Sequence, residues 1–545
     1  MKHLKILLSL LLVFSMLFCI VACDEEIDED LETDENEEEN EENEDEIKVK
    51  SVSLNESEIV LKVGEKETLK VSVKPSDATD KSVKWSSSDK DVATVTSKGV
   101  VKAVSEGEAV ITVTSANGKT DTCTVVVVPK SADTDDKETT ESEDAEATEE
   151  TDNENETEVT EETEATEETE ATEETEATEE TEATEETNAT EETEDTKPSE
   201  TTSPYKQRTY QFRSSTSKMK MIGRTQVLSS GIACDFTASG VAFNAYLKNA
   251  FTFTVDVEKN TTYFTVYVDG VRLPKRYEAP VGTDQSITVT GLGGDIELHE
   301  IRILKQNQPQ RSLTVLKSLK FYGVLDSAVE DKELYVEIIG DSITCGHGNL
   351  CANKTEGEAT TLYEDGTQAY AFLTAEKLGA DYSILGCSGI GIDTGWTGAL
   401  NELGFYPSTS YYRSNSAEYD FANARVPNVV IINLGTNDGP KWINNATVVS
   451  TEQPFKTNAR ALINLIRTKY NDPDLPIVWG YGMMGDLSLL NWDEWIESVA
   501  AEFDGVYTIK LPRNQDGGQG HPTVAGQEAA ANELFNFILS NEVIR

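Results

Sequence analysis

Hydrophobic and polar residues follow distinct patterns in successive parts of this chain of 545 residues. In residues 48–129 and 204–328 they alternate with a period of two between Gly, Asp and Asn turns, which predicts strands without helices. In residues 329–545 short apolar runs alternate with stretches of helical periodicity. Two further stretches, residues 23–47 and 130–203, hold almost no large apolar residues and cannot form a core. The predicted fold class is therefore multidomain, with two all-β domains followed by one α/β domain.

The first β segment, residues 48–129, has turns at the spacing of a sandwich. Three of its runs carry a resemblance: Val83–Val95, Gly99–Val104 and Gly107–Val113. On these runs the segment resembles a bacterial Ig-like domain of group two, which implies an Ig-like sandwich. Such domains act as spacers or adhesion units, and this segment holds no catalytic cluster.

The second β segment, residues 204–328, contains many short alternating runs and hairpin signals such as Asp269-Gly270. This pattern predicts a β-sandwich, which we interpret as a jelly roll. His299 lies inside one of its strands between acidic residues. We predict that His299 belongs to the surface face of that strand and is not a ligand.

The last segment, residues 329–545, predicts a parallel sheet covered on both faces, because its strands are mostly apolar. The expected strands are Leu334–Gly340, Tyr382–Gly386, Val429–Gly435, Ile477–Gly482 and Val506–Leu511. The expected helices are Ala369–Leu378, Phe455–Tyr470, Trp492–Phe503 and Val524–Leu539. In such folds the chemistry lies beyond the carboxyl ends of the strands.

Two acidic stretches, residues 23–47 and 130–203, account for most of the net charge of -54. Residues 24–50 contribute -15 and residues 130–203 contribute -30. The longer stretch contains a six-residue repeat rich in Thr and Glu, whose like charges oppose a helix. We predict that both stretches are disordered linkers, the longer one spanning about 50 Å and giving reach across a cell wall. The charge argues against nucleic acid as a partner.

The N-terminus has the features of a bacterial export signal. A short basic region precedes an apolar run from Ile6 to Val21, which is too short to span a membrane comfortably. Ile20-Val21-Ala22-Cys23 resembles a bacterial lipobox, which implies a signal peptide in residues 1–22 and lipidation of Cys23. We therefore expect a secreted lipoprotein, anchored at Cys23 to the outer face of the cell membrane. An ordinary secretory signal, or a cysteine there by chance, is the alternative.

Five of the seven cysteines lie outside the signal region. They show neither a CxxC motif nor a metal-ligand spacing, so the sequence predicts neither a disulfide framework nor a metal site. Cys345 and Cys351 are close in sequence and could pair, or both could remain reduced.

Chemically useful residues follow four of the predicted strands. Ser342 follows the first, Gly389 lies in the loop after the second, Asn437 follows the third and His521 follows the last. A serine hydroxyl needs a base to take its proton, and imidazole titrates near neutral pH. Acyl transfer creates an oxyanion, for which the N–H groups of Ser342 and Gly389 and the Asn437 amide could be donors. The sequence therefore predicts ester hydrolysis with Ser342 as nucleophile and His521 as base.

These four blocks resemble those of the SGNH, or GDSL, hydrolase superfamily. A β domain directly before Gly340–Gly346, together with Asn433–Asp438 and Tyr481–Gly485, resembles carbohydrate esterase family two. Enzymes of that family remove acetyl groups from plant polysaccharides such as xylan or glucomannan. The resemblance implies a serine acetylesterase whose partner is an acetylated polysaccharide, with no metal or organic cofactor.

The sequence departs from the superfamily at the acid of the catalytic triad. An Asp usually stands three residues before the His, and here Gly518 stands there. Some family-two esterases lack this acid and use a Ser–His dyad, with a backbone carbonyl holding the imidazole, so we expect a dyad. Asp516 and Asn514 are nearby substitutes, and a bend in the glycine-rich loop could bring Asp516 to the ring.

A second departure concerns the sugar. Family-two esterases often carry a Trp directly before the catalytic His, where this chain has Gly520. Trp442 or Trp396 could provide the sugar platform instead, or both could pack in a core or loop. His347 is a rival base, but we expect that it shapes the substrate pocket.

Other functions remain open on the sequence alone. No carboxylate pair has the spacing of a glycosidase, and Asp341 and Asp438 are expected to bond to neighbouring backbone. A lipase-like or thioesterase acyl hydrolase, or an esterase of cell-wall acetyl groups, would keep the chemistry and change the substrate. A non-catalytic carbohydrate-binding or adhesion protein would use the two β domains alone.

Overall fold

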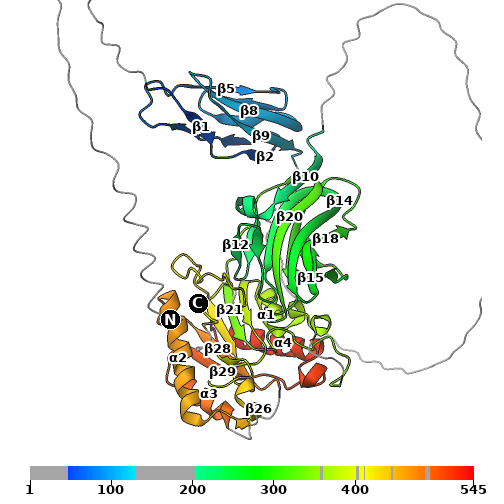
Figure 1. Cartoon of the computed structure of the whole chain (residues 1–545), viewed down its shortest axis with the longest axis vertical. Helices are drawn as coiled ribbons and strands as arrows, with labels where there is room; N and C mark the ends of the chain where they lie inside the picture. The colour runs from blue at the N-terminus through cyan, green and yellow to red at the C-terminus, as the bar shows by residue number, and fades with distance from the viewer. Residues whose placement is uncertain are drawn as a thin grey trace, which may run out of the picture.

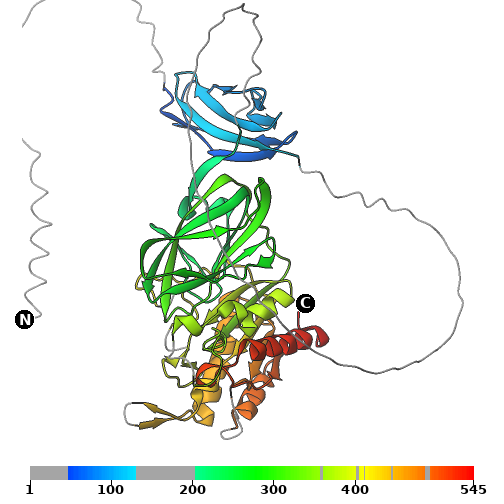
Figure 2. The same cartoon turned by 90° about the vertical axis from the view of Figure 1, so that its right-hand side faces the viewer.

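The structure is a computed structural model in which three folded parts lie in a row (Figures 1 and 2). It describes residues 47–130, 203–355, 360–400, 404–409, 412–443, 446–484 and 491–544. Cys23, the signal peptide and nearly all of both acidic stretches lie outside these residues, so the predictions about them stay predictions. No helix within the described ranges combines the length and the apolar character that crossing a membrane requires.

The first part is the all-β segment that the alternation predicts. β2, β9, β8 and β5 form one sheet, β3, β7 and β6 form another, and β1 pairs with β4. Leu61, Val101, Ile111 and Val125 come from both larger sheets and lie in one buried cluster. The strands are β1 (Ser51–Leu54), β2 (Glu58–Lys62), β3 (Lys66–Thr68), β4 (Val71–Lys74), β5 (Val83–Ser87), β6 (Ala93–Val95), β7 (Val100–Ala103), β8 (Gly107–Ser115) and β9 (Thr120–Val128).

The second part, here called the middle β domain (residues 203–328), is organised around one long strand. β14 pairs with β18, β19 and β20, and every second residue from Phe251 to Val257 is buried. The strands are β10 (Lys206–Gln211), β11 (Lys220–Ile222), β12 (Gln226–Leu228), β13 (Gly231–Ala233), β14 (Gly240–Lys259), β15 (Thr262–Val268), β16 (Val271–Arg272), β17 (Tyr277–Ala279), β18 (Gly282–Thr290), β19 (Glu297–Lys305) and β20 (Ser312–Leu325). The finer assignment as a jelly roll stays a prediction.

The prediction that His299 belongs to the surface face of its strand is wrong. Its side chain is 10% exposed, and its Nδ1 lies 2.7 Å from Oδ2 of Asp269. The Asp269-Gly270 hairpin, which the sequence does predict, brings this carboxylate against the strand that carries His299. A polar partner therefore lets the imidazole be buried.

The third part, here called the hydrolase domain (residues 329–544), is built on a five-stranded parallel sheet in the order β22-β21-β25-β28-β29. α1 and α4 pack in one apolar cluster with the sheet and α2 and α3 in another, so the helices cover both faces. The predicted strands and helices are confirmed to within a few residues. They are β21 (Tyr335–Gly340), α1 (Tyr370–Lys377), β22 (Asp381–Gly386), β25 (Val429–Asn433), α2 (Glu452–Tyr470), β28 (Ile477–Tyr481), α3 (Trp492–Ala500), β29 (Val506–Lys510) and α4 (Val524–Ser540).

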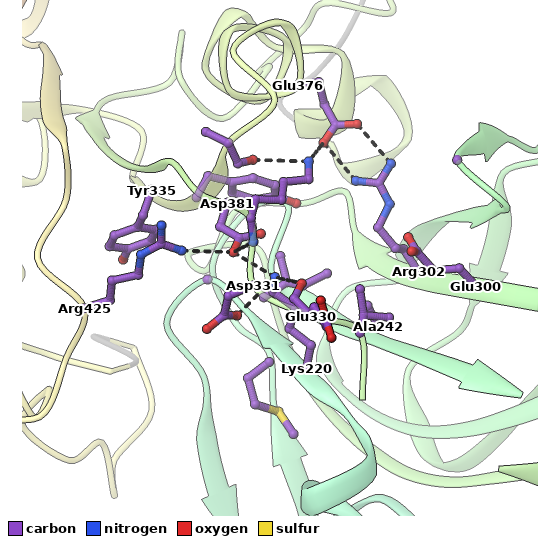
Figure 3. Close-up of a pocket in the computed structure, with 18 of the residues that line it drawn as sticks. Lys220, Ala242, Glu300, Arg302, Glu330, Asp331, Tyr335, Glu376, Asp381 and Arg425 are labelled. Atoms are coloured by element: carbon purple, nitrogen blue, oxygen red, sulfur yellow. Dashed lines mark hydrogen bonds and ion pairs between the residues drawn. The ribbon is translucent and has the colours of Figure 1, made fainter. Parts of the chain in front are cut away.

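A cavity of about 700 Å³ lies between the middle β domain and the hydrolase domain. Tyr335, the first residue of β21, lines it, whereas Ser342 follows the last residue of that strand. Its charged side chains face one another (Figure 3): Lys220 and Arg425 both contact Asp381, at 2.7 and 3.3 Å. The cavity therefore belongs to the joint between the two domains and not to the predicted site.

Candidate active site

The register of the parallel sheet brings the predicted site residues to one edge. Gly340, the last residue of β21, is paired with Gly386 of β22 on one side and with Asn433 of β25 on the other. The three loops that follow these residues carry Ser342, Gly389 and Asn437. Because the carboxyl ends of parallel strands end at the same level, these loops meet above the sheet.

His521 reaches Ser342 from the loop before α4. Its Nε2 lies 2.8 Å from Oγ of Ser342, and its Nδ1 lies 3.1 Å from the carbonyl oxygen of Gly518. Both side chains are buried. Burial, and the neighbouring His347, lower the pKa of His521 to about 3. The imidazole is therefore neutral at ordinary pH, which is the form that can accept a proton.

Asp516 points away from this pair. It is exposed, and its carboxylate accepts a hydrogen bond from Nδ2 of Asn514 at 3.3 Å. Oδ1 of Asn514 accepts from the backbone N–H of Thr523 at 2.9 Å, so Asn514 braces the loop and does not contact the ring. The two imidazole nitrogens of His521 thus face the carbonyl of Gly518 and the hydroxyl of Ser342.

The predicted oxyanion donors lie on the neighbouring loops. Gly389 has φ +81°, and a Cβ there would lie 3.0 Å from Cβ of Trp396, so glycine suits the position on both counts. Nδ2 of Asn437 donates to Oδ2 of Asp341 and to the carbonyl of Ile390, each at 3.0 Å. An amide nitrogen carries two hydrogens, so one of these bonds must give way before Asn437 can donate to a substrate oxygen.

The two aspartates beside the site bond to backbone, as predicted. Asp341 accepts from the N–H of Ile343 at 2.9 Å, and burial raises its pKa to about 7. Asp438 accepts from the N–H groups of Ile392, Asp393 and Thr394, each at 2.8 Å. Burial raises the pKa of Asp438 despite these donors. Asp438 therefore fixes the loop that follows Gly389.

His347 and the tryptophans occupy different positions. The ring of His347 is buried with its centroid 4.5 Å from that of His521, but its nitrogens face Glu364 and Gln519. Trp396 is 59% exposed beside the oxyanion loop, so it does not pack in a core. Trp442 lies in β26 (Lys441–Ile443), and its side chain is outside what the structure describes.

Sequence reasoning missed a group of polar residues behind the site. Gln308 and Gln310, from the loop between β19 and β20 of the middle β domain, bond to the backbone N–H and the carbonyl of Ser388, at 3.0 and 2.9 Å. Glu364 is fully buried and accepts from Gln308. The only signal was composition: the run Gln306-Asn-Gln-Pro-Gln-Arg311 is unusually amide-rich for a β domain.

The open question on the cysteines has an answer. Cys345 is a buried thiol, so it does not form a disulfide with Cys351. Burial raises the pKa of Cys345 well above its ordinary value. Across the described ranges, no cluster of three or more His, Cys, Asp and Glu residues is placed to hold a metal ion.

Comparison with known families matches two parts of the chain. The model described as GDSL-like Lipase/Acylhydrolase family matches residues 338–529, which contain Ser342, Gly389, Asn437 and His521. The model described as Bacterial Ig-like domain (group 2) matches residues 48–125. Both agree with the resemblances that the sequence motifs suggest.

Individual relatives point in the same direction. The Cellulase/esterase CelE of Acetivibrio thermocellus is 31% identical over 321 residues, which are 56% of this chain and 37% of that protein. An Acetylxylan esterase / glucomannan deacetylase of Cellvibrio japonicus is 28% identical over 212 residues, 37% of this chain and 56% of that protein. The chain thus spans about a third to just over half of the length of these curated relatives.

A solved structure matches more than half of the chain. It is a family two carbohydrate esterase from Clostridium thermocellum in complex with cellohexaose, with a TM-score of 0.53 and 26% identity. The match covers 59% of this chain and 99% of that one. Two regions of the chain therefore match the GDSL-like lipase/acylhydrolase family and the bacterial Ig-like domain of group 2, and its structural neighbours include family two carbohydrate esterases.

Proposed function

We propose that this protein is a serine esterase that removes O-acetyl groups from a polysaccharide of the acetylxylan or glucomannan type. The observation that carries the proposal is the 2.8 Å contact between Oγ of Ser342 and Nε2 of His521, whose Nδ1 faces a backbone carbonyl. The names of the relatives, a cellulase/esterase and an acetylxylan esterase / glucomannan deacetylase, support this substrate class.

The proposed mechanism uses a Ser–His dyad. The carbonyl of Gly518 can only accept a hydrogen bond, so Nδ1 of His521 carries the hydrogen and Nε2 is free to take the proton of Ser342. Ser342 Oγ then attacks the acetyl carbonyl, and the N–H groups of Ser342 and Gly389 and the amide of Asn437 stabilise the oxyanion. The protonated His521 returns its proton to the departing sugar oxygen.

In the second step water hydrolyses the acetyl-enzyme, with the same residues as acid and base. His521 takes a proton from water, which attacks the acetyl-Ser342 ester, and acetate leaves as Ser342 regains its hydrogen. The backbone carbonyl of Gly518 performs the orienting half of the role of a triad acid, because it fixes the tautomer of the ring. It carries no full charge, so it stabilises the imidazolium less than a carboxylate would.

Trp396 supports a sugar substrate. An indole with 59% of its surface exposed is unusual for a side chain of this size, and it lies next to Gly389. Aromatic rings present a flat apolar face on which the C–H face of a sugar can stack. We propose that Trp396 takes the place of the Trp that other family-two esterases carry where this chain has Gly520.

The test is acetate release by the whole protein and by Ser342→Ala. The proposal expects release from acetylated xylan and from an aryl acetate, much slower turnover of the matching aryl butyrate, and no measurable turnover by the variant. Preference for the butyrate would favour a lipase-like acyl hydrolase instead. Carbohydrate binding without turnover in the parent protein would favour the adhesion alternative.

Localisation is a separate proposal. We propose that Cys23 is lipidated and holds the protein on the outer face of the cell membrane, on the strength of the lipobox-like sequence Ile20–Cys23. Metabolic labelling with a tagged fatty acid should mark the parent protein and leave Cys23→Ser unmarked. Equal labelling of both would contradict the assignment.

A further inference from the structure

We propose that the middle β domain supports the catalytic centre, and that Gln308, Gln310, Glu364, His347 and Gln519 are positioning residues. In this arrangement one continuous set of contacts holds both the oxyanion loop at Ser388-Gly389 and the turn whose carbonyl orients His521. The inference rests on the proposed esterase function, because it assigns these residues to the support of Ser342 and His521.

Gln308 links the two domains at the oxyanion loop. Its side chain is fully buried; Oε1 accepts the N–H of Ser388 at 3.0 Å, and Nε2 donates to Oε2 of Glu364 at 2.6 Å. Its own backbone N–H donates to Oε1 of Glu364 at 2.5 Å. Gln310 holds the next peptide, the one that carries the N–H of Gly389, by donating to the carbonyl of Ser388 at 2.9 Å. The residue before Gly389 is therefore held at both its N–H and its carbonyl from the middle β domain.

Glu364 connects this anchor to His347. Its carboxylate is fully buried, and a buried carboxylate is costly unless its oxygens receive hydrogen bonds. Besides the two donors of Gln308, Oε2 lies 3.4 Å from Nδ1 of His347 and 3.8 Å from Nε of Arg311. The chain thus keeps a carboxylate beside a histidine, although the position of the usual triad acid is Gly518.

His347 connects Glu364 to the turn that precedes His521. Its Nε2 lies 3.2 Å from Oε1 of Gln519, which has φ +55° between two glycines. Positive φ is unfavourable for a residue with a side chain, so this turn needs outside support. Two backbone bonds add to it: the N–H of Gly518 donates to the carbonyl of Gly348 at 2.9 Å, and that of Gln519 to Lys354 at 3.2 Å.

The turn matters because the direction of the Gly518 carbonyl is set by the backbone conformation alone. The Gly518 oxygen can orient Nδ1 of His521 only if the turn Gly517–Gly520 is held in place. A misplacement of about 1 Å in such a group can lower the rate a hundredfold. Glu364 and His347 therefore act on His521 through the turn. The carboxylate of Glu364 is linked to this turn by the side chains of His347 and Gln519.

The test uses Gln519→Ala and Gln310→Ala in the whole protein, with an aryl acetate as substrate. Gln519→Ala removes the contact with His347 beside the turn, and Gln310→Ala removes the contact with the carbonyl of Ser388 in the oxyanion loop. We expect kcat to fall about 10- to 100-fold while KM changes less than threefold, since the lost group orients the reacting residues and does not bind substrate. Gln519→Glu keeps an acceptor oxygen at the same reach and should recover most of kcat.

Matched controls are Asp516→Asn, an exposed residue three positions from Gln519, and Gln207→Ala, an exposed residue of β10. Both should keep the parental kcat, and thermal unfolding should confirm that every variant is folded. Parental kcat in folded Gln519→Ala and Gln310→Ala, or no recovery by Gln519→Glu, would overturn the inference. Turnover by Ser342→Ala would instead overturn the proposed function, so the two failures are distinct.

Discussion

The middle β domain contacts a neighbour on each side, and the two joints differ in kind. Toward the Ig-like domain the joint combines a small apolar cluster with ion pairs. The cluster consists of Val60, Val126, Val128, Tyr205, Tyr246, Ile296 and Val324. Glu108 contacts Arg208 and Lys206, each at 2.7 Å; the Arg208 side chain is 8% exposed and that of Lys206 58%.

The joint toward the hydrolase domain combines a larger apolar cluster with a buried ion pair. Arg224, next to β11, contacts Glu337 of β21 at 2.9 Å, and both side chains are completely inaccessible to solvent. The hydroxyl groups of Tyr406 and Tyr470 also donate to Glu337, at 2.7 and 2.9 Å. The Arg224 guanidinium lies against the rings of Tyr406, Tyr419 and Phe421 at 4.9, 4.3 and 5.0 Å.

The difference teaches which domain belongs to the catalytic unit. A buried ion pair contributes little net stability against an apolar contact, but it tolerates only one arrangement of its partners. The outer joint has a small apolar cluster, and one of its two ion pairs to Glu108 comes from the exposed Lys206, so we expect it to tolerate more. We therefore expect damage to the inner joint and to the loops it supports to disable the enzyme, and damage to the outer joint to leave it working.

The largest effect should come from the loop that the inner joint supports. His521→Ala removes the base and should lower turnover about a thousandfold or more, whereas Asp516→Asn, on the same loop, should stay within about threefold of the parent. Steady-state acetate release by both variants measures this. A hundredfold loss in Asp516→Asn would establish a triad and refute the dyad.

The next effect concerns the inner joint itself. Glu337→Gln leaves Arg224 buried without its charge partner, which should lower the free energy of unfolding by about 3–5 kcal/mol. Urea unfolding monitored by tryptophan fluorescence gives the value. Lys206→Met at the outer joint is the comparison and should cause little change, as is usual for exposed ion pairs. Equal losses in the two variants would erase the distinction between the joints.

The pH profile probes the same loop without a substitution. His521 must be neutral to act as base, and burial lowers its pKa to about 3, so lowering the pH protonates it only well below the usual histidine range. Activity on an aryl acetate should therefore persist at pH 5, and the acid limb of kcat/KM should lie far below pH 6.5. A limb centred near 6.5 would mean that the ring is solvated in the working enzyme.

The smallest effect should follow removal of the outer joint. Deleting residues 24–203 takes away the Ig-like domain and both acidic stretches but leaves every contact of the inner joint. Turnover of a soluble ester should stay within about twofold of the parent, since charges beyond about 10 Å are screened at ordinary salt. A large loss in the folded, truncated protein would mean that the outer joint takes part in catalysis.

Sequence patterns predicted the strands that are buried along their whole length. The strands of the parallel sheet are buried on both faces, so their apolar runs mark them directly, and the four site residues follow them in order. β14 was less predictable. The polar Lys248-Asn249 step suggests two strands, but the chain continues as one, with Asn249 at φ +62° where the pairing with β20 shifts register.

The contacts behind the site could not be foreseen for a different reason. Gln308, Glu364 and His347 come from three separate loops, and polar loop residues are ordinarily exposed. Their burial depends on partners 17 to 80 positions away in sequence, which no local pattern encodes. The same holds for His299, whose burial depends on Asp269 thirty positions earlier.

The outer joint has a mechanical consequence. Val128, at the end of the Ig-like domain, and Tyr205, at the start of the middle β domain, belong to the same apolar cluster (Figure 1). The segment between them therefore begins and ends at one place, and its length cannot set the distance between the two domains while the cluster holds. The two domains can therefore separate only if a force first breaks this apolar cluster.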